Sequence, residues 1–275
     1  MLPDTLLSRA TRYLAGEIQA ALPRDASTVL LLRDTAAGLE VYVLRRQLSM
    51  AFAGGMYAFP GGSVDPRDSD RHISWAGPQD EEWARRLGCD AALARALVCA
   101  AVRELFEEAG VLLAGSGPED VVGDTTADAW ERDRAALADH SLAFAELLAR
   151  RGMMLRSDLL GYWAHWTTPE FEPRRYDTRF FVAALPVGQR TRDVSGEADH
   201  VAWEFPGAVA TAADERRAAM LPPTYVALAD LTRYADVAAV LSEAAAPGRT
   251  VAHVVPGVEV VDGGAYLTLP DGVLP

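Results

Sequence analysis

The stretch that decides the fold is RELFEEAGV, residues 103–111, which closes the clearest helix of the chain. Upstream of it, apolar residues recur at steps of three and four from Leu97 to Ala109, the spacing of one helix face. Gly110 then stands where helices commonly end in a left-handed residue. The spacing predicts a helix over 92–109 with one face in the core.

The other face of this helix carries three acids. Glu104, Glu107 and Glu108 are three or four residues apart, so their carboxylates lie on one side. Like charges at this spacing repel each other, and the neighbouring cations are Arg103 beside them and Arg95 two turns back. A hard divalent ion such as Mg²⁺ or Mn²⁺ favours clustered carboxylate oxygens. A solvated acidic face is the alternative.

Composition excludes several classes of function. The chain has 275 residues, half of them hydrophobic, which is enough for a full core. Its formal charge of −13 argues against a nucleic-acid partner. All 26 basic residues are arginine, which excludes a P-loop lysine and lysine Schiff-base chemistry.

Other features of the chain indicate its compartment. Cys89 and Cys99 form no metal or disulfide motif, which suits a reducing compartment. No apolar run reaches the length of a membrane span, and residues 1–24 read as an amphipathic helix with charges that a secretory leader avoids. We therefore expect a cytoplasmic protein with no membrane partner.

The five histidines form no zinc-protease motif, and such scattered histidines are more often structural; they are His72, His140, His165, His200 and His253.

The remaining pattern predicts an α+β fold with a mixed sheet, in one domain over 1–275. Residues 66–91 read as a surface insertion with a helical patch near 81–87, and residues 206–275 as a C-terminal extension. Strands are predicted at 27–33, 39–46, 161–166, 178–185 and 200–205, with a short one in 52–62 and a pair near 251–269. Further helices are predicted at 127–151, 207–218 and 223–244.

The helix string has an upstream partner, Phe59-Pro60-Gly61-Gly62. Residues 103–111 fit every fixed position in the second half of the Nudix box, G-x5-E-x7-R-E-U-x-E-E-x-G-U, in which U is aliphatic. Six residues after Gly62 stands Asp68, an acid where the box has glutamate, and 34 residues instead of seven then precede Arg103. The chain therefore resembles a Nudix hydrolase whose box is split by a loop. Because long ordered insertions are usually functional, we expect residues 66–91 to shape the substrate entrance.

The strings over 45–68 and 166–181 resemble the peroxisomal coenzyme A diphosphatase branch of this superfamily. One departure is Ala51, which stands where the coenzyme A signature of another Nudix branch has arginine. The resemblance implies a Nudix α/β/α sandwich and metal-dependent hydrolysis of a nucleoside diphosphate linked to another group. Coenzyme A or acyl-coenzyme A is the first choice of substrate. An ADP-ribose or dinucleotide pyrophosphatase and a non-catalytic nucleotide-sensing module are the alternatives, and a homodimer is left open.

The resemblance also implies roles for individual residues. Glu104, Glu107 and Glu108, with the carbonyl of Gly61, would hold Mg²⁺ or Mn²⁺; Glu104 would also act as general base and Arg103 would hold a glutamate in place. A distal acid often completes such sites. We choose Glu197 over Glu170 and Glu172. Substrate contacts are expected from Arg46, Phe59, Arg174, Tyr176 and Arg179.

Overall fold

The central strand of the fold is apolar on both faces. The computed structural model describes residues 4–49, 53–194, 196, 198–262, 264–270 and 272–273. In β1 (Arg24–Thr35), Val29 and Leu31 belong to one buried cluster, whereas Leu30 and Leu32 belong to another. Because successive side chains of a strand point to opposite faces, β1 must be covered on both sides.

An eight-stranded mixed sheet surrounds β1. Its main path runs β10-β2-β1-β9-β8-β11, with β3 added to β2 and β4 added to β1. The β1–β9 and β8–β11 pairs are parallel and the other pairs are antiparallel. The strands are β2 (Gly38–Arg46), β3 (Tyr57–Ala58), β4 (Gly61–Ser63), β8 (Gly161–Thr167), β9 (Tyr176–Ala184), β10 (Ala198–Glu204) and β11 (His253–Val254).

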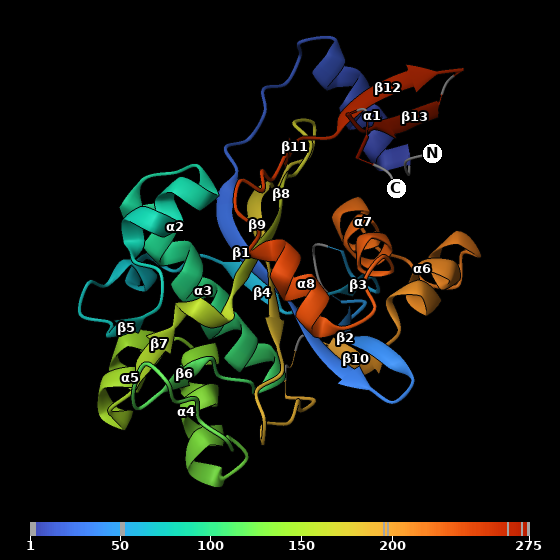
Figure 1. Cartoon of the computed structure of the whole chain (residues 1–275). Coiled ribbons are helices and arrows are strands. Elements are labelled where there is room, and N and C mark those ends of the chain that lie inside the picture. Colours follow the sequence, from blue (N-terminus) through green and yellow to red (C-terminus); the bar gives the residue numbers. More distant parts are fainter. Residues whose placement is uncertain are drawn as a thin grey trace.

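Helices cover both faces of this sheet (Figure 1). On one side lie α2 (Asp80–Leu87), α3 (Ala91–Ala109), α4 (Asp128–Ala138) and α5 (Phe144–Arg151). On the other lie α6 (Pro206–Asp214), α7 (Pro222–Leu231) and α8 (Val237–Ala244). The predicted α+β sandwich with a mixed sheet is therefore confirmed.

Two long predicted helices are wrong, because each is broken in the middle. The helix predicted over 127–151 divides into α4 and α5, and His140 between them adopts φ +62°. The helix predicted over 223–244 divides into α7 and α8, where the Asp236 side chain accepts a hydrogen bond from the Ala239 N–H and starts a new helix. A left-handed residue in the first case and a capping side chain in the second therefore outweighed the continuous apolar period.

The segment predicted as an insertion packs behind α3. It contains a 3₁₀ turn (Pro66–Ser69), β5 (Trp75–Ala76) and α2. The Trp83 side chain is fully buried, with its ring 5.9 Å from that of Phe181. Arg95 on α3 binds Asp80 at 3.0 Å and the Ile73 carbonyl at 2.6 Å. Strand β5 also joins β7 (Met154–Arg156) and β6 (Ala114–Gly115) in a small sheet.

The two ends of the described chain pack against each other. Helix α1 (Asp4–Leu14) lies beside the hairpin of β12 (Gly257–Val261) and β13 (Gly264–Thr268), as Figure 1 shows. Ala10, Phe171 and Ala265 form the small core between them. Among the residues that the structure describes, no helix has both the length and the apolar character needed to cross a membrane.

Candidate active site

A cavity of about 1070 Å³ opens where the C-terminal half of α3 meets β3, β4 and the ends of β8 and β9. Glu104, Glu107 and Glu108 line one wall of it, and Gly61 and Gly62 lie beside them. The sequence-predicted acids and the Pro-Gly-Gly turn, more than 40 residues apart, are therefore brought together.

The three glutamates are largely buried, although they line a cavity. Between 7% and 9% of each residue is exposed. Arg103 compensates part of this charge, since its Nη1 lies 2.8 Å from Glu104 Oε1 and 3.1 Å from Glu107 Oε1. Glu108 instead accepts a hydrogen bond from the Gly61 N–H at 2.8 Å. Each carboxylate is thus held on the α3 wall by a defined partner.

The glycines of the turn are required by close approach. Strand β4 pairs with β1 so that Gly61 lies opposite Thr28 and Gly62 opposite Ser27. A Cβ on Gly62 would come within 2.4 Å of Glu104 Oε1, and a Cβ on Gly61 within 2.5 Å of the Ser27 carbonyl oxygen. Only glycine therefore lets the turn, the sheet and the carboxylate approach this closely.

Burial changes the acidity of the site. Burial raises the pKa of Glu104 to about 7, while Arg103 opposes the shift and Glu107 adds to it. Burial also raises the pKa of Glu107 above its usual value, again against the effect of Arg103. A carboxyl group with a pKa near neutrality can exchange a proton at physiological pH.

The split box is joined through a buried ion pair. Asp68, 1% exposed, binds Arg103 with Oδ2 2.9 Å from Nη2 and Oδ1 3.0 Å from Nε. Arg103 Nη2 also donates to the Ser63 carbonyl at 2.9 Å. The acid six residues after Gly62 thus reaches the helix across the intervening segment, and Arg103 links Asp68 to Glu104 and Glu107.

The donor set suits a hard divalent ion by its charge. Arg103 binds three buried acids, Asp68, Glu104 and Glu107. Glu108 adds a fourth buried acid, so the negative charge at this wall exceeds the charge of Arg103. In the described part of the chain, the three glutamates do not bring one carboxylate oxygen each within 4.8 Å of one another. Arg103 separates two of them, so ion binding requires their side chains to turn.

Most predicted substrate contacts reach the cavity. Arg46, Phe59, Arg174 and Tyr176 all line it. Arg179 does not belong to the described lining, which corrects that prediction: its Nη1 binds Asp177 Oδ2 at 2.5 Å and it is 4% exposed. Residues 176, 178 and 180 of β9 face the cavity, so residue 179 faces the other way.

The distal acid stays a prediction, because Glu197 lies outside the described residues. Val194 and Gly196 on the same loop line the cavity. Its competitor Glu172 also lines the cavity, and burial raises its pKa. Glu170 instead accepts a hydrogen bond from the Tyr13 hydroxyl on α1.

The structure adds residues that the sequence analysis missed. Arg134 on α4 donates a hydrogen bond to the Glu107 carbonyl at 2.8 Å. Arg134 and His140 both line the cavity. An apolar part of the wall comes from the C-terminal segment: Leu221, Pro222, Pro223, Pro256 and Leu267. No local pattern marks these residues, since long-range packing brings them to the site. Within 66–91, Pro66 alone lines the cavity, and the expected role of residues 66–91 at the substrate entrance stays a prediction.

Comparison with known proteins agrees with this geometry. The family model described as the NUDT19 Nudix domain matches residues 79–231, more than half of the chain. Putative nudix hydrolase 7 of Caenorhabditis elegans is 24% identical over 221 residues, covering 80% of this chain and 64% of that protein. Acyl-coenzyme A diphosphatase NUDT19 of Xenopus laevis is 22% identical over 238 residues, covering 74% of this chain and 63% of that protein. The chain thus spans less than two thirds of the length of these relatives.

A solved structure shares the architecture. The crystal structure of a NUDIX hydrolase from Alicyclobacillus acidocaldarius superposes with a TM-score of 0.68 at 26% identity, covering 81% of this chain and 96% of that one. With the family match and the α3 carboxylate wall, it identifies the chain as a member of the Nudix hydrolases, in the family of the NUDT19 Nudix domain.

Proposed function

We propose that this protein is a divalent-metal-dependent pyrophosphohydrolase whose substrate is coenzyme A or an acyl-coenzyme A. The observation that carries the proposal is the buried carboxylate wall of α3 facing a cavity of about 1070 Å³. A wall of this charge suits a cation that also binds a diphosphate, because the ion neutralises both partners.

The residues that would hold Mg²⁺ or Mn²⁺ are Glu104, Glu107, Glu108 and the carbonyl of Gly61. A bound ion would supply charge neutralisation at the phosphate oxygens and acidify the attacking water. Glu104 would accept a proton of that water, since its carboxylate lies on the cavity wall beside the Gly61-Gly62 turn. The water oxygen bonds to phosphorus, and the bridging P–O bond breaks with its electrons on the departing phosphate. Arg103 positions Glu104 throughout.

The form of the cavity favours a long substrate with an apolar arm. Its volume lies just above the range of about 300–1,000 Å³ found for small-molecule sites. One wall is acidic, whereas Leu221, Pro256 and Leu267 make another part apolar. The pantetheine and acyl parts of an acyl-coenzyme A suit this apolar wall better than the ribose of ADP-ribose does. Arg174 and Tyr176 line the cavity and would contact a phosphate and the adenine base.

The test is a substrate panel with the purified chain in Mg²⁺ and in Mn²⁺. It contains coenzyme A, an acyl-coenzyme A, ADP-ribose and a dinucleoside polyphosphate, and products are separated by chromatography. We expect phosphopantetheine, or its acylated form, and adenosine 3′,5′-bisphosphate as the main products, lost in Glu104→Gln. Preferred cleavage of ADP-ribose or of the dinucleotide would reject the substrate assignment. Nucleotide binding without any cleavage would indicate the sensing module.

A matched pair of variants tests the apolar wall. Leu267 lines the cavity, whereas Leu269, two residues later, lines a separate hollow with Tyr225. Leu267→Asn should raise KM for acyl-coenzyme A about tenfold, because a buried methylene-rich contact is replaced by an amide. It should leave KM for ADP-ribose unchanged, and Leu269→Asn should change neither. Equal effects on both substrates would contradict the assigned wall.

A further inference from the structure

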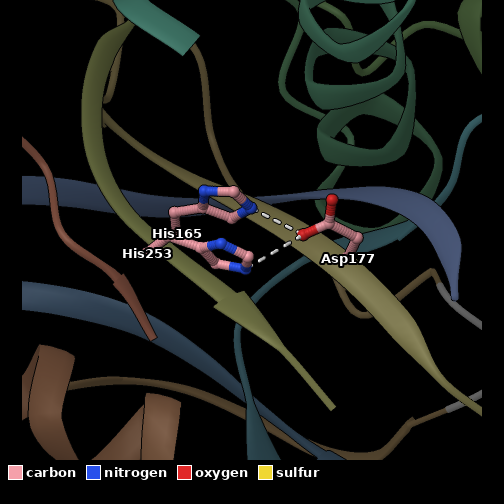
Figure 2. A group of neighbouring side chains, drawn as sticks. All are labelled: His165, Asp177 and His253. Carbon is pink, nitrogen blue, oxygen red and sulfur yellow. Dashed lines mark hydrogen bonds and ion pairs between the residues drawn. The ribbon is translucent and has the colours of Figure 1, made fainter. Parts of the chain in front are cut away.

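A second cluster of potential ligands lies on the sheet, apart from the α3 acids. Figure 2 shows His165 on β8, Asp177 on β9 and His253 on β11 with two ring nitrogens turned toward one carboxylate. His165 Nε2 lies 2.6 Å from Asp177 Oδ1, and His253 Nε2 lies 3.9 Å from the same oxygen. The rings stack with centroids 3.8 Å apart and planes 9° apart. Three donor atoms from three strands therefore lie within 4.8 Å of one another.

The sheet register brings these residues together. His253 lies directly opposite His165 in the parallel β8–β11 pair, and Asp177 lies opposite Thr167 in the antiparallel β8–β9 pair. Opposed side chains on neighbouring strands are close enough to touch. Asp177 follows His165 by 12 residues and His253 follows it by 88, so no short sequence motif contains the cluster.

Surrounding groups orient the carboxylate. Thr167 Oγ1 donates to Asp177 Oδ1 at 2.7 Å and also lies 2.7 Å from His253 Nε2. Arg179 Nη1 binds the other oxygen, Oδ2, at 2.5 Å, and it lies 3.8 Å from Asp25. Oδ1 is therefore directed to the two imidazoles, while Oδ2 is held away from them. The Arg179 contact is the kind of support that metal-ligating carboxylates have, whereas Thr167 Oγ1 must leave His253 Nε2 when an ion binds there.

We propose that His165, Asp177 and His253 bind a transition-metal ion of the zinc class, which fastens the C-terminal segment to the sheet. Two imidazoles and one carboxylate form a common zinc ligand set, with bonds of about 2.0–2.2 Å. Tetrahedral geometry at these lengths places ligand atoms about 3.4 Å apart. The His165–Asp177 distance of 2.6 Å must widen and the His253–Asp177 distance of 3.9 Å must shorten, and the stacked rings must splay.

Solvent can reach this position and complete the coordination. The His253 side chain is 48% exposed, whereas that of His165 is 11% exposed. A water molecule can therefore serve as the fourth ligand. The chemistry of the site also differs from that of the α3 wall, because imidazole favours zinc and its neighbours whereas carboxylates favour Mg²⁺ and Mn²⁺.

The location gives the ion a structural role. Strand β11 has two residues and pairs only with β8 in the described sheet. Pro256, two residues beyond it, and Leu267 in the following hairpin both line the large cavity. An ion bridging β8, β9 and β11 would strengthen the attachment of the segment that carries this wall.

The test is calorimetric titration of Zn²⁺ into the chelator-treated full chain, with excess Mg²⁺ present to occupy the carboxylate sites. We expect one Zn²⁺ per chain, with affinity at least tenfold weaker in His253→Asn and in Asp177→Asn. The matched control is His72→Asn, because His72 Nδ1 lies 2.8 Å from Asp70 Oδ1 in an exposed His–Asp pair. His72→Asn and Glu108→Gln should bind as the wild type does, which separates this site from the proposed catalytic one.

A second measurement does not depend on the folding of any variant. Co²⁺ in the wild-type protein should develop the visible absorption of a low-coordinate, imidazole-bound ion, and stoichiometric Zn²⁺ should abolish it. Absence of that spectrum, or of stoichiometric zinc binding by the wild type, overturns the proposal. Equal zinc affinity of the wild type and folded His253→Asn also overturns it. The histidines would then serve only as hydrogen-bond partners of Asp177 and Thr167.

Discussion

Gly62→Ala should separate catalysis from stability at the α3 wall. The added Cβ would lie 2.4 Å from Glu104 Oε1, whereas ordinary contacts begin at 3.4 Å, so the carboxylate must retreat by about 1 Å. Neither Gly62 nor Gly61 has a positive φ, so the backbone accepts alanine. A displacement of this size near a reaction centre can lower the rate about 100-fold, or about 2.7 kcal/mol of activation free energy.

The assay compares kcat for the best substrate of the panel with the free energy of unfolding in urea. The free energy of unfolding of Gly62→Ala should lie within about 1 kcal/mol of that of the wild type, because the atoms that meet the new Cβ are the carboxylate atoms at the end of the Glu104 side chain. Gly61→Ala is the control: its Cβ meets the Ser27 carbonyl at 2.5 Å and the Thr28 Cα at 2.7 Å. Those atoms are backbone, so we expect a loss of about 1–3 kcal/mol of stability. A kcat for Gly62→Ala within twofold of the wild type would refute the placement of Glu104 in the site.

Three further predictions concern the charges of the site. Glu104 binds its proton more tightly in the fold, with a pKa of about 7 against 4.5, so its contribution to stability is complete below pH 4.5 and is lost as the pH rises through 7. The Tm of the metal-free protein should therefore fall between about pH 5 and 7, and Glu104→Gln should flatten that slope. Asp68→Asn leaves Arg103 without its buried partner and should lower the free energy of unfolding in urea by about 3 kcal/mol. Asp65→Asn is the comparison, because Asp65 pairs with Arg67, whose side chain is 42% exposed, and this loss should stay under about 1 kcal/mol. Glu197→Gln should lower kcat without changing Tm, and a rate loss in Glu172→Gln instead would move the distal acid to that residue.

Local chemistry decided which elements were predictable. The α3 helix was predicted to within one residue, because its apolar period and its terminal glycine agree with each other. Strands β1 and β2 were predicted because runs of β-branched and aliphatic residues end at clear turns. Helix breaks at His140 and Asp236 were missed, because a single capping side chain or left-handed residue outweighs a long period.

Site residues follow the same division. The sequence by itself determined that Glu104, Glu107 and Glu108 share a helix face, because periodicity is a local property of the chain. Only the tertiary structure decided that Arg103 binds Asp68 at the start of the inserted segment, that Arg179 turns away from the cavity and that His165 meets His253. These contacts depend on strand register and on packing between distant segments, and no spacing along the chain encodes either of them.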